Sequence, residues 1–348
     1  MLLRICRPTQ KIIQIFLKCI KNQNYIRFIS LTPVLFPRPF DDSTAKEATI
    51  AESRFYLPSL KEASDVRNTI LQRSMHSFLE RFDMGSLKIL TLPAGESNLM
   101  YLIIDVQTNE AAVVDPFDVT LVLKYIKKMP NLKLSTILTT HFHYQHSGGN
   151  KKLLQLTKNI PEVYGSQSRI PALTRRIHDN DIITFGNSTI KCISTPFHTS
   201  GDMCYFVESP NKDIRALFTG DTLYQAGCGK VIEGSYYDLH KALYKKLAKL
   251  PDDTLIFGGH ENTVENLLFA MKVDPENYHI QRRLNWAETR RSAKYSTIPS
   301  TLMEEKLWNP YLRVHTPSIK TITKENDNVR ALNKLKDMED LYMKGELV

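Results

Sequence analysis

Apolar and polar residues alternate in different ways along the chain. Residues 41–58 are polar and irregular. From Ser59 to Phe82, apolar residues recur at roughly helical spacing, which predicts an amphipathic helix that ends at residues 83–86. We expect this helix to pack on the domain that follows, with a role in association as the alternative.

Short apolar runs typical of strands begin at Leu87 and alternate with predicted helices. The predicted strands are 88–92, 100–104, 111–114, 136–138, 189–193, 203–207, 214–218 and 254–257, and the predicted helices between them are 119–127 and 236–250. After His260 the pattern becomes helical, at 264–272, 275–291, 300–307 and 325–341. This order predicts an α/β (α+β) fold of stacked sheets flanked by helices.

Charge is concentrated at the start of the chain. The protein has 348 residues, is 42% hydrophobic and carries a formal net charge of +9, which is enough apolar material for one large or two modest domains. Residues 1–40 hold seven Lys or Arg and no acid, so the 46 basic residues less these seven leave 39 against 37 acidic ones. The near-neutral remainder argues against a nucleic-acid partner.

Residues 1–40 combine this positive charge with an apolar run between Ile12 and Ile20. A cationic amphipathic helix of this kind is typical of a mitochondrial presequence, so we predict import into the matrix. The alternatives are a cytoplasmic protein and, for residues 1–40 themselves, a peripheral membrane helix or a disordered segment. A secretory signal is disfavoured because Lys18 and Lys21 close the apolar run early. The run is also too short and too charged for a transmembrane span.

Three cysteines, Cys192, Cys204 and Cys228, fall in the predicted folded region and form no CxxC motif. Unpaired thiols in this arrangement indicate a reducing compartment and no disulfide framework. Cys228 stands between two glycines, where it can line a site or serve as a small buried filler.

Three histidines within six residues make up half of a candidate metal centre. His141 and His143 follow the apolar run 136–138, and alternate residues of an extended segment point the same way, so these two can bind one ion. His146, on the following turn, is left for a second ion. Three further residues follow or end later strand-like runs, where loops at one edge of a sheet would gather them, namely His198, Asp221 and His260.

Imidazole and carboxylate groups are ligands that zinc, ferrous iron and manganese accept. A single histidine is as often structural as functional, but the set in this order favours a metal centre. A metal held by neutral imidazoles lowers the pKa of its water to about 7 and can polarise a carbonyl group. A thioester suits this chemistry because a thiolate leaves without a strong general acid.

The histidine motif and several other segments resemble the metallo-β-lactamase superfamily and, within it, the hydroxyacylglutathione hydrolases (glyoxalase II). The resemblance covers roughly residues 86–315 and includes the segments 112–116, 226–230, 299–305 and 309–310. Residues 332–338 are similar to the branch that contains the probable hydrolase of paroxysmal nonkinesigenic dyskinesia.

The resemblance implies a metallo-β-lactamase αββα sandwich over residues 86–261 and a C-terminal helical domain over residues 262–348. Residues 1–40 would then be the presequence, and residues 41–85 a linker with the amphipathic helix.

The resemblance also implies the roles of individual residues. His141, His143 and His198 would hold a first ion, His146 and His260 a second, and Asp221 would bridge them, with Asp221, His141 and His143 also counted as catalytic. Zinc is the expected metal, with iron or manganese as alternatives. The substrate would be a glutathione thioester, S-(2-hydroxyacyl)glutathione, as in methylglyoxal detoxification. Lys230, Arg313 and Cys228 are the candidate substrate-binding residues, the two cations pairing with glutathionyl carboxylates.

Three positions depart from the family pattern. Gln145 stands where related enzymes have an Asp that binds the second ion, and Asn262 and Ile232 replace two tyrosines of the glutathione site. A neutral amide is a poorer ligand than a carboxylate, so we expect one or two ions with the second site weakened, and reduced or redirected hydrolysis.

These departures keep two alternatives open. The protein can be a degenerate, non-hydrolytic relative that acts by binding, or a mononuclear metal enzyme on another thiol substrate such as a glutathione persulfide. The helical C-terminus favours the hydrolase over the latter, and the sequence favours no particular oligomeric state.

Overall fold

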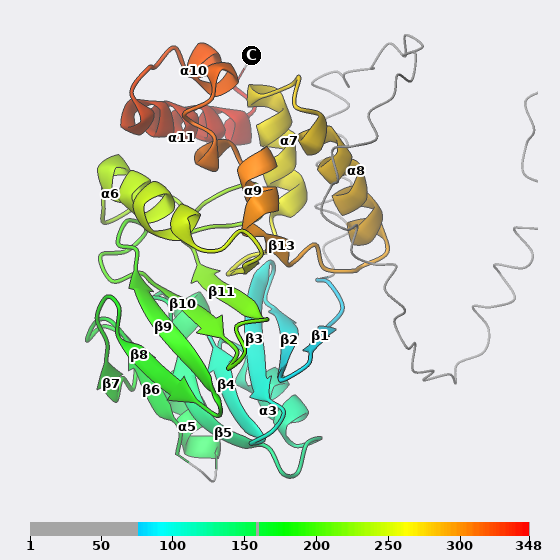
Figure 1. Cartoon of the computed structure of the whole chain (residues 1–348), viewed down its shortest axis with the longest axis vertical. Helices are drawn as coiled ribbons and strands as arrows, with labels where there is room; N and C mark the ends of the chain where they lie inside the picture. The colour runs from blue at the N-terminus through cyan, green and yellow to red at the C-terminus, as the bar shows by residue number, and fades with distance from the viewer. Residues whose placement is uncertain (1–75, 158–159, 348) are drawn as a thin grey trace, which may run out of the picture. The chain divides into compact units, whose positions relative to one another are not determined.

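Two β-sheets pack face to face in the computed structural model, which describes residues 76–157 and 160–347 (Figure 1). Helices cover the outer face of each sheet, and a group of helices follows at the C-terminal end. The expected αββα sandwich with a C-terminal helical part is therefore confirmed.

The first sheet has the strand order β1-β2-β3-β4-β5-β6-β7. Its first four strands pair antiparallel, and the later ones pair parallel. The strands are β1 (Glu80–Met84), β2 (Leu87–Ala94), β3 (Asn98–Asp105), β4 (Glu110–Val114), β5 (Lys133–Leu138), β6 (Glu162–Gly165) and β7 (Arg175–Arg176).

The second sheet has the order β13-β12-β11-β10-β9-β8. Neighbouring strands pair antiparallel except β11 and β12, which are parallel. The strands are β8 (Ile182–Phe185), β9 (Ser188–Ser194), β10 (Met203–Glu208), β11 (Arg215–Gly220), β12 (Leu255–Gly258) and β13 (Ser300–Thr301).

Aromatic side chains fill the space between the two sheets. Tyr101 of β3 lies 5.2 Å from the ring of Phe218 and 5.4 Å from that of Phe257, measured between ring centroids. All three are fully buried, and aromatic pairs of this kind contribute about 0.5–1.5 kcal/mol each beyond their buried area. The Tyr101 hydroxyl donates to the carbonyl of Gly258, which fixes the end of β12 against β3.

Helices cover both outer faces of the sandwich. On the first sheet, α3 (Val119–Ile126) and α5 (Asn150–Leu156) bury Val122 and Leu153. On the second sheet, a continuous helical segment packs with the last helix of the chain. That segment consists of α6 (Tyr236–His240), the π-helix η2 (Lys241–Lys246) and the 3₁₀ turn η3 (Leu247–Lys249), and the last helix is α11 (Asn328–Lys344).

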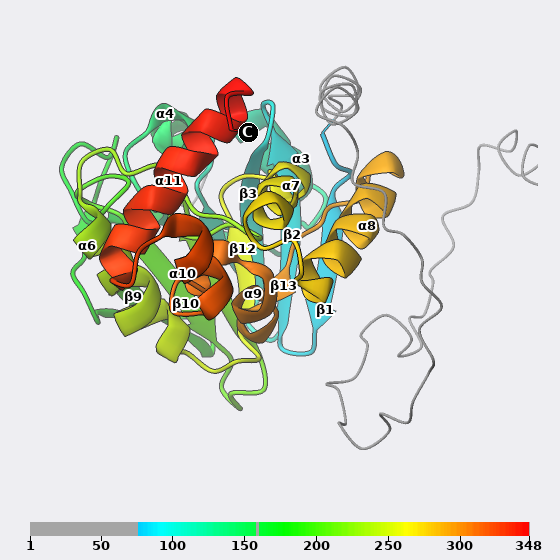
Figure 2. The same cartoon turned by 90° about the horizontal axis from the view of Figure 1, so that it is seen from above.

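The remaining helices lie near the C-terminal end of the chain, except for one short turn after β5 (Figure 2). They are α4 (Tyr144–Ser147), α7 (Thr263–Val273), α8 (Tyr278–Ser292), α9 (Leu302–Trp308), η4 (Pro310–Leu312) and α10 (Pro317–Thr323). Helices α7, α8 and α9 share a small apolar cluster of their own.

The prediction of a helix from Ser59 to Phe82 is wrong at its C-terminal end. Residues 59–75 lie outside the described residues, but residues 80–84 form strand β1, which pairs antiparallel with β2. Here the apolar residues alternate with a period of two, so Phe82 and Met84 turn toward the space between the sheets. The hydrogen bonds offered by the edge of β2 favour this strand over the helix.

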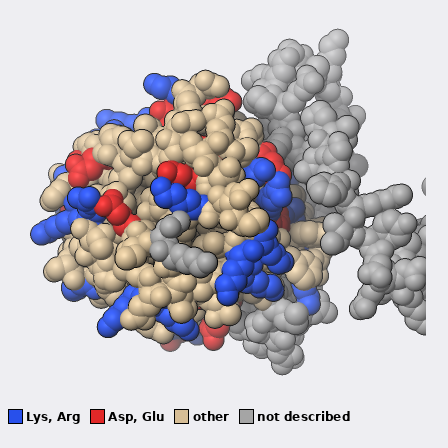
Figure 3. Space-filling view, turned by 90° about the horizontal axis from the view of Figure 1, so that it is seen from below, with Lys and Arg blue, Asp and Glu red and all other residues tan. Residues whose placement is uncertain are grey.

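In the part of the chain that the structure describes, no helix is long and apolar enough to cross a membrane. On the face seen in Figure 3, basic and acidic side chains are interspersed. The predicted presequence, residues 1–40, lies outside the described residues.

Candidate metal centre

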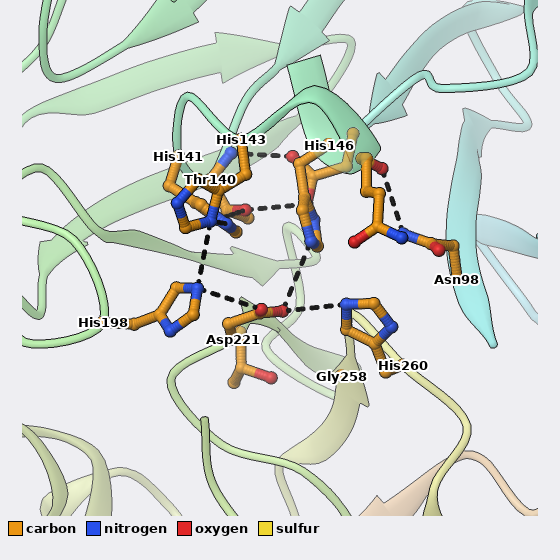
Figure 4. Close-up of polar contacts among 12 residues, drawn as sticks. Asn98, Thr140, His141, His143, His146, His198, Asp221, Gly258 and His260 are labelled. Carbon is orange, nitrogen blue, oxygen red and sulfur yellow. Dashed lines mark hydrogen bonds and ion pairs between the residues drawn. The ribbon is translucent and has the colours of Figure 1, made fainter. Parts of the chain in front are cut away.

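The loops that follow four strands bring the predicted ligands together. The C-terminal ends of β5, β9, β11 and β12 lead into the segments that carry the histidines and Asp221. Figure 4 shows these side chains converging from both sheets. The set consists of His141, His143, His146, His198, Asp221 and His260, the six residues predicted from the sequence to be ligands.

Three imidazoles form the first group. His141 Nε2 lies 3.0 Å from His143 Nδ1, and His198 Nε2 lies 3.1 Å from the same atom. Ligand nitrogens about 2.0–2.1 Å from a tetrahedral zinc ion stand roughly 3.3 Å apart. The spacing of these three nitrogens therefore fits a single ion.

Asp221 joins this group to two further histidines. Its Oδ2 atom lies 3.2 Å from His198 Nε2, whereas Oδ1 lies 3.4 Å from His146 Nε2 and 3.5 Å from His260 Nε2. Among the described residues, no hydrogen bond reaches the buried Oδ1 atom. An unsatisfied buried carboxylate oxygen is costly, and a cation at this position would relieve the cost. The donor set thus fits a metal.

Hydrogen bonds hold four of the imidazoles by their other ring nitrogen. In each case Nδ1 is engaged, which leaves Nε2 facing the centre and fixes the orientation of the ring. The acceptors are Thr140 Oγ1 for His141 at 3.0 Å, Asp115 Oδ2 for His146 at 2.9 Å, the Lys230 carbonyl for His198 at 2.9 Å and Ser97 Oγ for His260 at 2.9 Å.

Asp115 is a supporting residue to which the sequence analysis assigned no role. Its carboxylate accepts from the backbone N–H of Thr140 at 2.8 Å and from the Thr140 hydroxyl at 2.7 Å, besides its bond with His146. One carboxylate therefore supports the ligand in α4 and, through Thr140, also His141. An acid directly after the apolar run 111–114 was the signal in the sequence that could have identified it.

Ser97 and Asn98 are two further supporting residues that were not predicted from the sequence. Ser97 contacts the His260 ring, while Asn98 donates to the backbone carbonyl of Gln145 at 3.1 Å. The start of β3 thus supports the two segments that carry His146 and His260. Two polar residues ahead of an apolar strand are a weak signal, because turns commonly have the same composition.

Burial and charge set the protonation of the ligands. Burial lowers the pKa of His141 well below its ordinary value and also lowers the pKa of His143 and His260. Neutral imidazoles are the form that binds metals. Burial acts in the same direction on His146, but the carboxylates of Asp221 and Asp115 outweigh it and raise its pKa to about 9.

The pKa values of Asp221 and of the nearby Tyr224 are also shifted. Burial opposes ionisation of Asp221, yet the surrounding histidines, His146 first among them, hold its pKa below the ordinary range. Burial and the neighbouring Asp221 raise the pKa of Tyr224 well above its ordinary value. Asp221 is therefore an anion, and Tyr224, whose ring lies 5.8 Å from that of His260, keeps its proton.

The three positions that depart from the family pattern lie around these segments. Gln145 belongs to α4 and has an exposed side chain. Asn262 is the residue before the first turn of α7, and Ile232 is 58% exposed.

The candidate substrate-binding residues differ in their surroundings. The side chain of Lys230 is 78% exposed, 3.9 Å from Asp340, while its carbonyl supports His198. Arg313 is engaged by the buried Asp274 at 3.1 Å. Cys228 is 4% exposed within an apolar cluster, and burial raises the pKa of its thiol to about 12, as expected of a small filler. Substrate contacts by these three residues stay a prediction.

The fold and the cluster of histidines are those of the metallo-β-lactamase superfamily, whose family model matches residues 94–260. A second model, described as hydroxyacylglutathione hydrolase C-terminus, matches residues 261–342. The chain belongs to the hydroxyacylglutathione hydrolase family within that superfamily.

Two relatives and one solved structure illustrate this. The chain is 39% identical over 259 residues to a hydroxyacylglutathione hydrolase-like protein of Gallus gallus, covering 74% of this chain and 91% of the relative. It is 43% identical over 234 residues to a hydroxyacylglutathione hydrolase of Arabidopsis thaliana named as cytoplasmic, covering 67% and 90%. The crystal structure of ETHE1 from Myxococcus xanthus shares the fold, with a TM-score of 0.50 at 20% identity, covering 75% of this chain and 91% of that one.

Proposed function

We propose that the protein is a metal-dependent hydrolase that splits S-(2-hydroxyacyl)glutathione into glutathione and a 2-hydroxy acid. The observation that carries this proposal is the convergence of five imidazoles and one buried aspartate, with three of the imidazoles within 3.5 Å of the aspartate's two oxygens. Membership of the family supports the same substrate class.

His141, His143, His198 and Asp221 would hold the first ion, and His146, His260 and Asp221 the second. We propose zinc, with iron or manganese as alternatives, because imidazole and carboxylate suit all three. The bound metal would supply a water of lowered pKa and polarise the thioester carbonyl.

The residues of the chain contribute positioning and charge. Asp221 turns Oδ1 toward His146 and His260 and Oδ2 toward His198, so its carboxylate would contribute negative charge to both ion sites. Its low pKa keeps it ionised for this task. The exposed ammonium group of Lys230 would pair with a carboxylate of the glutathionyl group. A thiolate leaves unaided, so this chemistry requires no buried general acid.

The direct test measures metal content and hydrolysis of S-D-lactoylglutathione on the same preparation. We expect turnover by protein that holds one ion firmly, with a second ion bound weakly because position 145 lacks a carboxylate. Protein that retains metal but turns over no thioester would contradict the proposal.

Restoring the acid at position 145 tests the cause of the weak second site. The Gln145→Asp variant should bind the second ion more tightly and hydrolyse the thioester faster. Gln145→Asn is the matched control, because it shortens the side chain equally without adding charge. An equal gain in both variants would show that charge is not the reason.

A non-hydrolytic relative that acts by binding is the second candidate, favoured by Gln145 and by the exposed Ile232. It predicts no turnover in the natural protein and a rise from near zero in Gln145→Asp. A single firmly held iron with oxygen uptake on a glutathione persulfide would indicate the mononuclear enzyme instead.

We further propose that residues 1–40 direct the protein to mitochondria, on the basis of their positive charge and apolar run. Residues 1–40 fused to a fluorescent protein should localise there, and the same fusion with its seven cations replaced by Ala should stay in the cytosol. Cytosolic location of both fusions would contradict this.

A further inference from the structure

An ion pair joins two loops near the first group of histidines. Arg169, between β6 and β7, donates from both terminal nitrogens to the two carboxylate oxygens of Glu233, at 2.6 Å each. Two parallel N–H···O bonds fix orientation as well as distance. Burial strengthens this ion pair only slightly, because the side chain of Arg169 is 42% exposed.

Glu233 connects this pair to the loop that carries His198. Its carboxylate accepts from the backbone N–H of Ser200 at 2.7 Å and from the Ser200 hydroxyl at 2.9 Å. Its own N–H donates to the carbonyl of His198 at 3.3 Å. Three residues earlier, Lys230 supplies the carbonyl that holds the His198 ring. The segments 198–200 and 230–233 are thus tied together at both ends.

Arg169 also contacts the first histidine motif. Its guanidinium carbon lies 3.8 Å from the centre of the Phe142 ring, within the range of a cation–π interaction. Phe142 stands between His141 and His143 in the chain, and its ring centroid is 4.7 Å from that of His143. The same guanidinium group therefore touches a neighbour of His143 and the acid that holds the loop of His198.

The segment of Arg169 is itself locked to the His198 loop. Ser166 Oγ donates to the carbonyl of Gly201, and Arg169 Nε donates to Gln167 Oε1 at 2.8 Å. A Cβ added at Gly201 would lie only 2.0 Å from Gln167 Nε2, so the two segments are in close contact. Movement of residues 166–169 would therefore move the loop that carries His198.

Exposed ion pairs contribute little to global stability, so stability does not account for so many converging contacts. We propose that Arg169 is a positioning residue for the metal centre, which fixes His198 through Glu233 and His143 through Phe142. The inference rests on the metal centre of the proposed function. It concerns the affinity of the first ion and does not depend on the identity of the substrate.

The test compares metal affinity in matched variants of the full chain. Arg169→Met keeps a long side chain but removes the ion pair. Arg175→Met removes a comparable exposed pair, Arg175 with Glu162 at 2.7 Å, from a neighbouring strand. Chelator competition with Zn²⁺ should show the first ion bound about 10-fold more weakly in Arg169→Met, as for other residues that orient metal ligands, and unchanged in Arg175→Met. The melting temperature of the metal-free protein should be similar in both.

Three further measurements separate positioning from general loss of structure. The visible spectrum of the Co²⁺-loaded protein should change in Arg169→Met and not in Arg175→Met, because it reports ligand geometry. Arg169→Lys, which keeps the charge without the paired geometry, should restore only part of the affinity. Glu233→Gln should weaken binding less in Arg169→Met than in the parent, because the two side chains act together.

Parental Zn²⁺ affinity and an unchanged Co²⁺ spectrum in Arg169→Met would overturn the inference, as would equal weakening in Arg175→Met. Thioester turnover is not part of this measurement. Protein that binds Zn²⁺ but hydrolyses nothing refutes the proposed function and leaves the role of Arg169 to be decided by the variants.

Discussion

Replacing Asp115 by Asn should weaken the second ion selectively. The Asp115 Oδ2 atom accepts the proton on His146 Nδ1 at 2.9 Å, and both side chains are almost fully buried. In Asp115→Asn, the amide oxygen is needed at the Oδ1 place, where it accepts from the backbone N–H of Thr140, and the NH₂ group left at the Oδ2 place cannot accept that proton. The imidazole then carries its proton on Nε2, the atom that faces Asp221 and must be free to bind a metal.

The size of the effect follows from this one bond. A hydrogen bond to a charged group contributes about 1.5–3 kcal/mol, and about 1.4 kcal/mol corresponds to a tenfold change in affinity. The second ion should therefore bind roughly 10- to 100-fold more weakly, in line with other residues that orient metal ligands. The affinity for the first ion should fall less, because Asp115 contacts His141 only through Thr140.

Zinc titration of the metal-free protein against a chelator gives both affinities, and circular dichroism checks the fold. Asp105→Asn is the matched control, since Asp105 is also a buried carboxylate that accepts from backbone N–H groups. It lies at the end of β3 that is farther from the metal centre. Asp105→Asn should lower stability without changing metal affinity. A folded Asp115→Asn protein with parental affinity for both ions would refute the reasoning, and so would equal weakening in Asp105→Asn.

Two further substitutions test the packing around the site. In Gly149→Ala, the new Cβ would lie 2.0 Å from the Pro116 carbonyl oxygen, so the backbone must move. The free energy of unfolding measured in urea should fall by roughly 1–3 kcal/mol. A fall of less than about 0.5 kcal/mol would show that α5 shifts freely. Burial raises the pKa of Glu305, so the unfolded state ionises first and stability should fall as pH rises from the unfolded pKa of about 4.3 through the folded value. Urea unfolding between pH 4 and 7 should show a steeper fall of stability in the parent than in Glu305→Gln; equal slopes would contradict it.

The sequence predicted β2 to β5 and β9 to β12 because each is a short apolar run with turn residues at both ends. It failed at β1, where Phe78 and Phe82 fit a helical repeat as well as a strand. The pairing with β2 that decides between them is a tertiary contact. It also failed at β7, an exposed pair of arginines with no apolar signal, which becomes a strand only because β6 offers an edge.

The ligands were predictable because three of them fall within six residues. Their supporting partners were not. Ser97 meets His260 across 163 residues, and Asp115 meets His146 across 31, and neither pair has a local pattern. The ion pair between Arg313 and Asp274 could not be predicted from the sequence either, because the sequence around Arg313 does not indicate whether its side chain has a partner.

The role of Asp115 can be separated into charge and orientation. Among the described residues, the carboxylates within 4 Å of the ligand imidazoles are Asp115 and Asp221, so two divalent ions would be only half compensated. Gln145→Asp adds the missing charge but cannot restore the proton acceptor of His146. If Asp115 acts by charge, Gln145→Asp should rescue Asp115→Asn. Because the geometry points to orientation, we expect the double variant to bind the second ion 10- to 100-fold more weakly than Gln145→Asp alone.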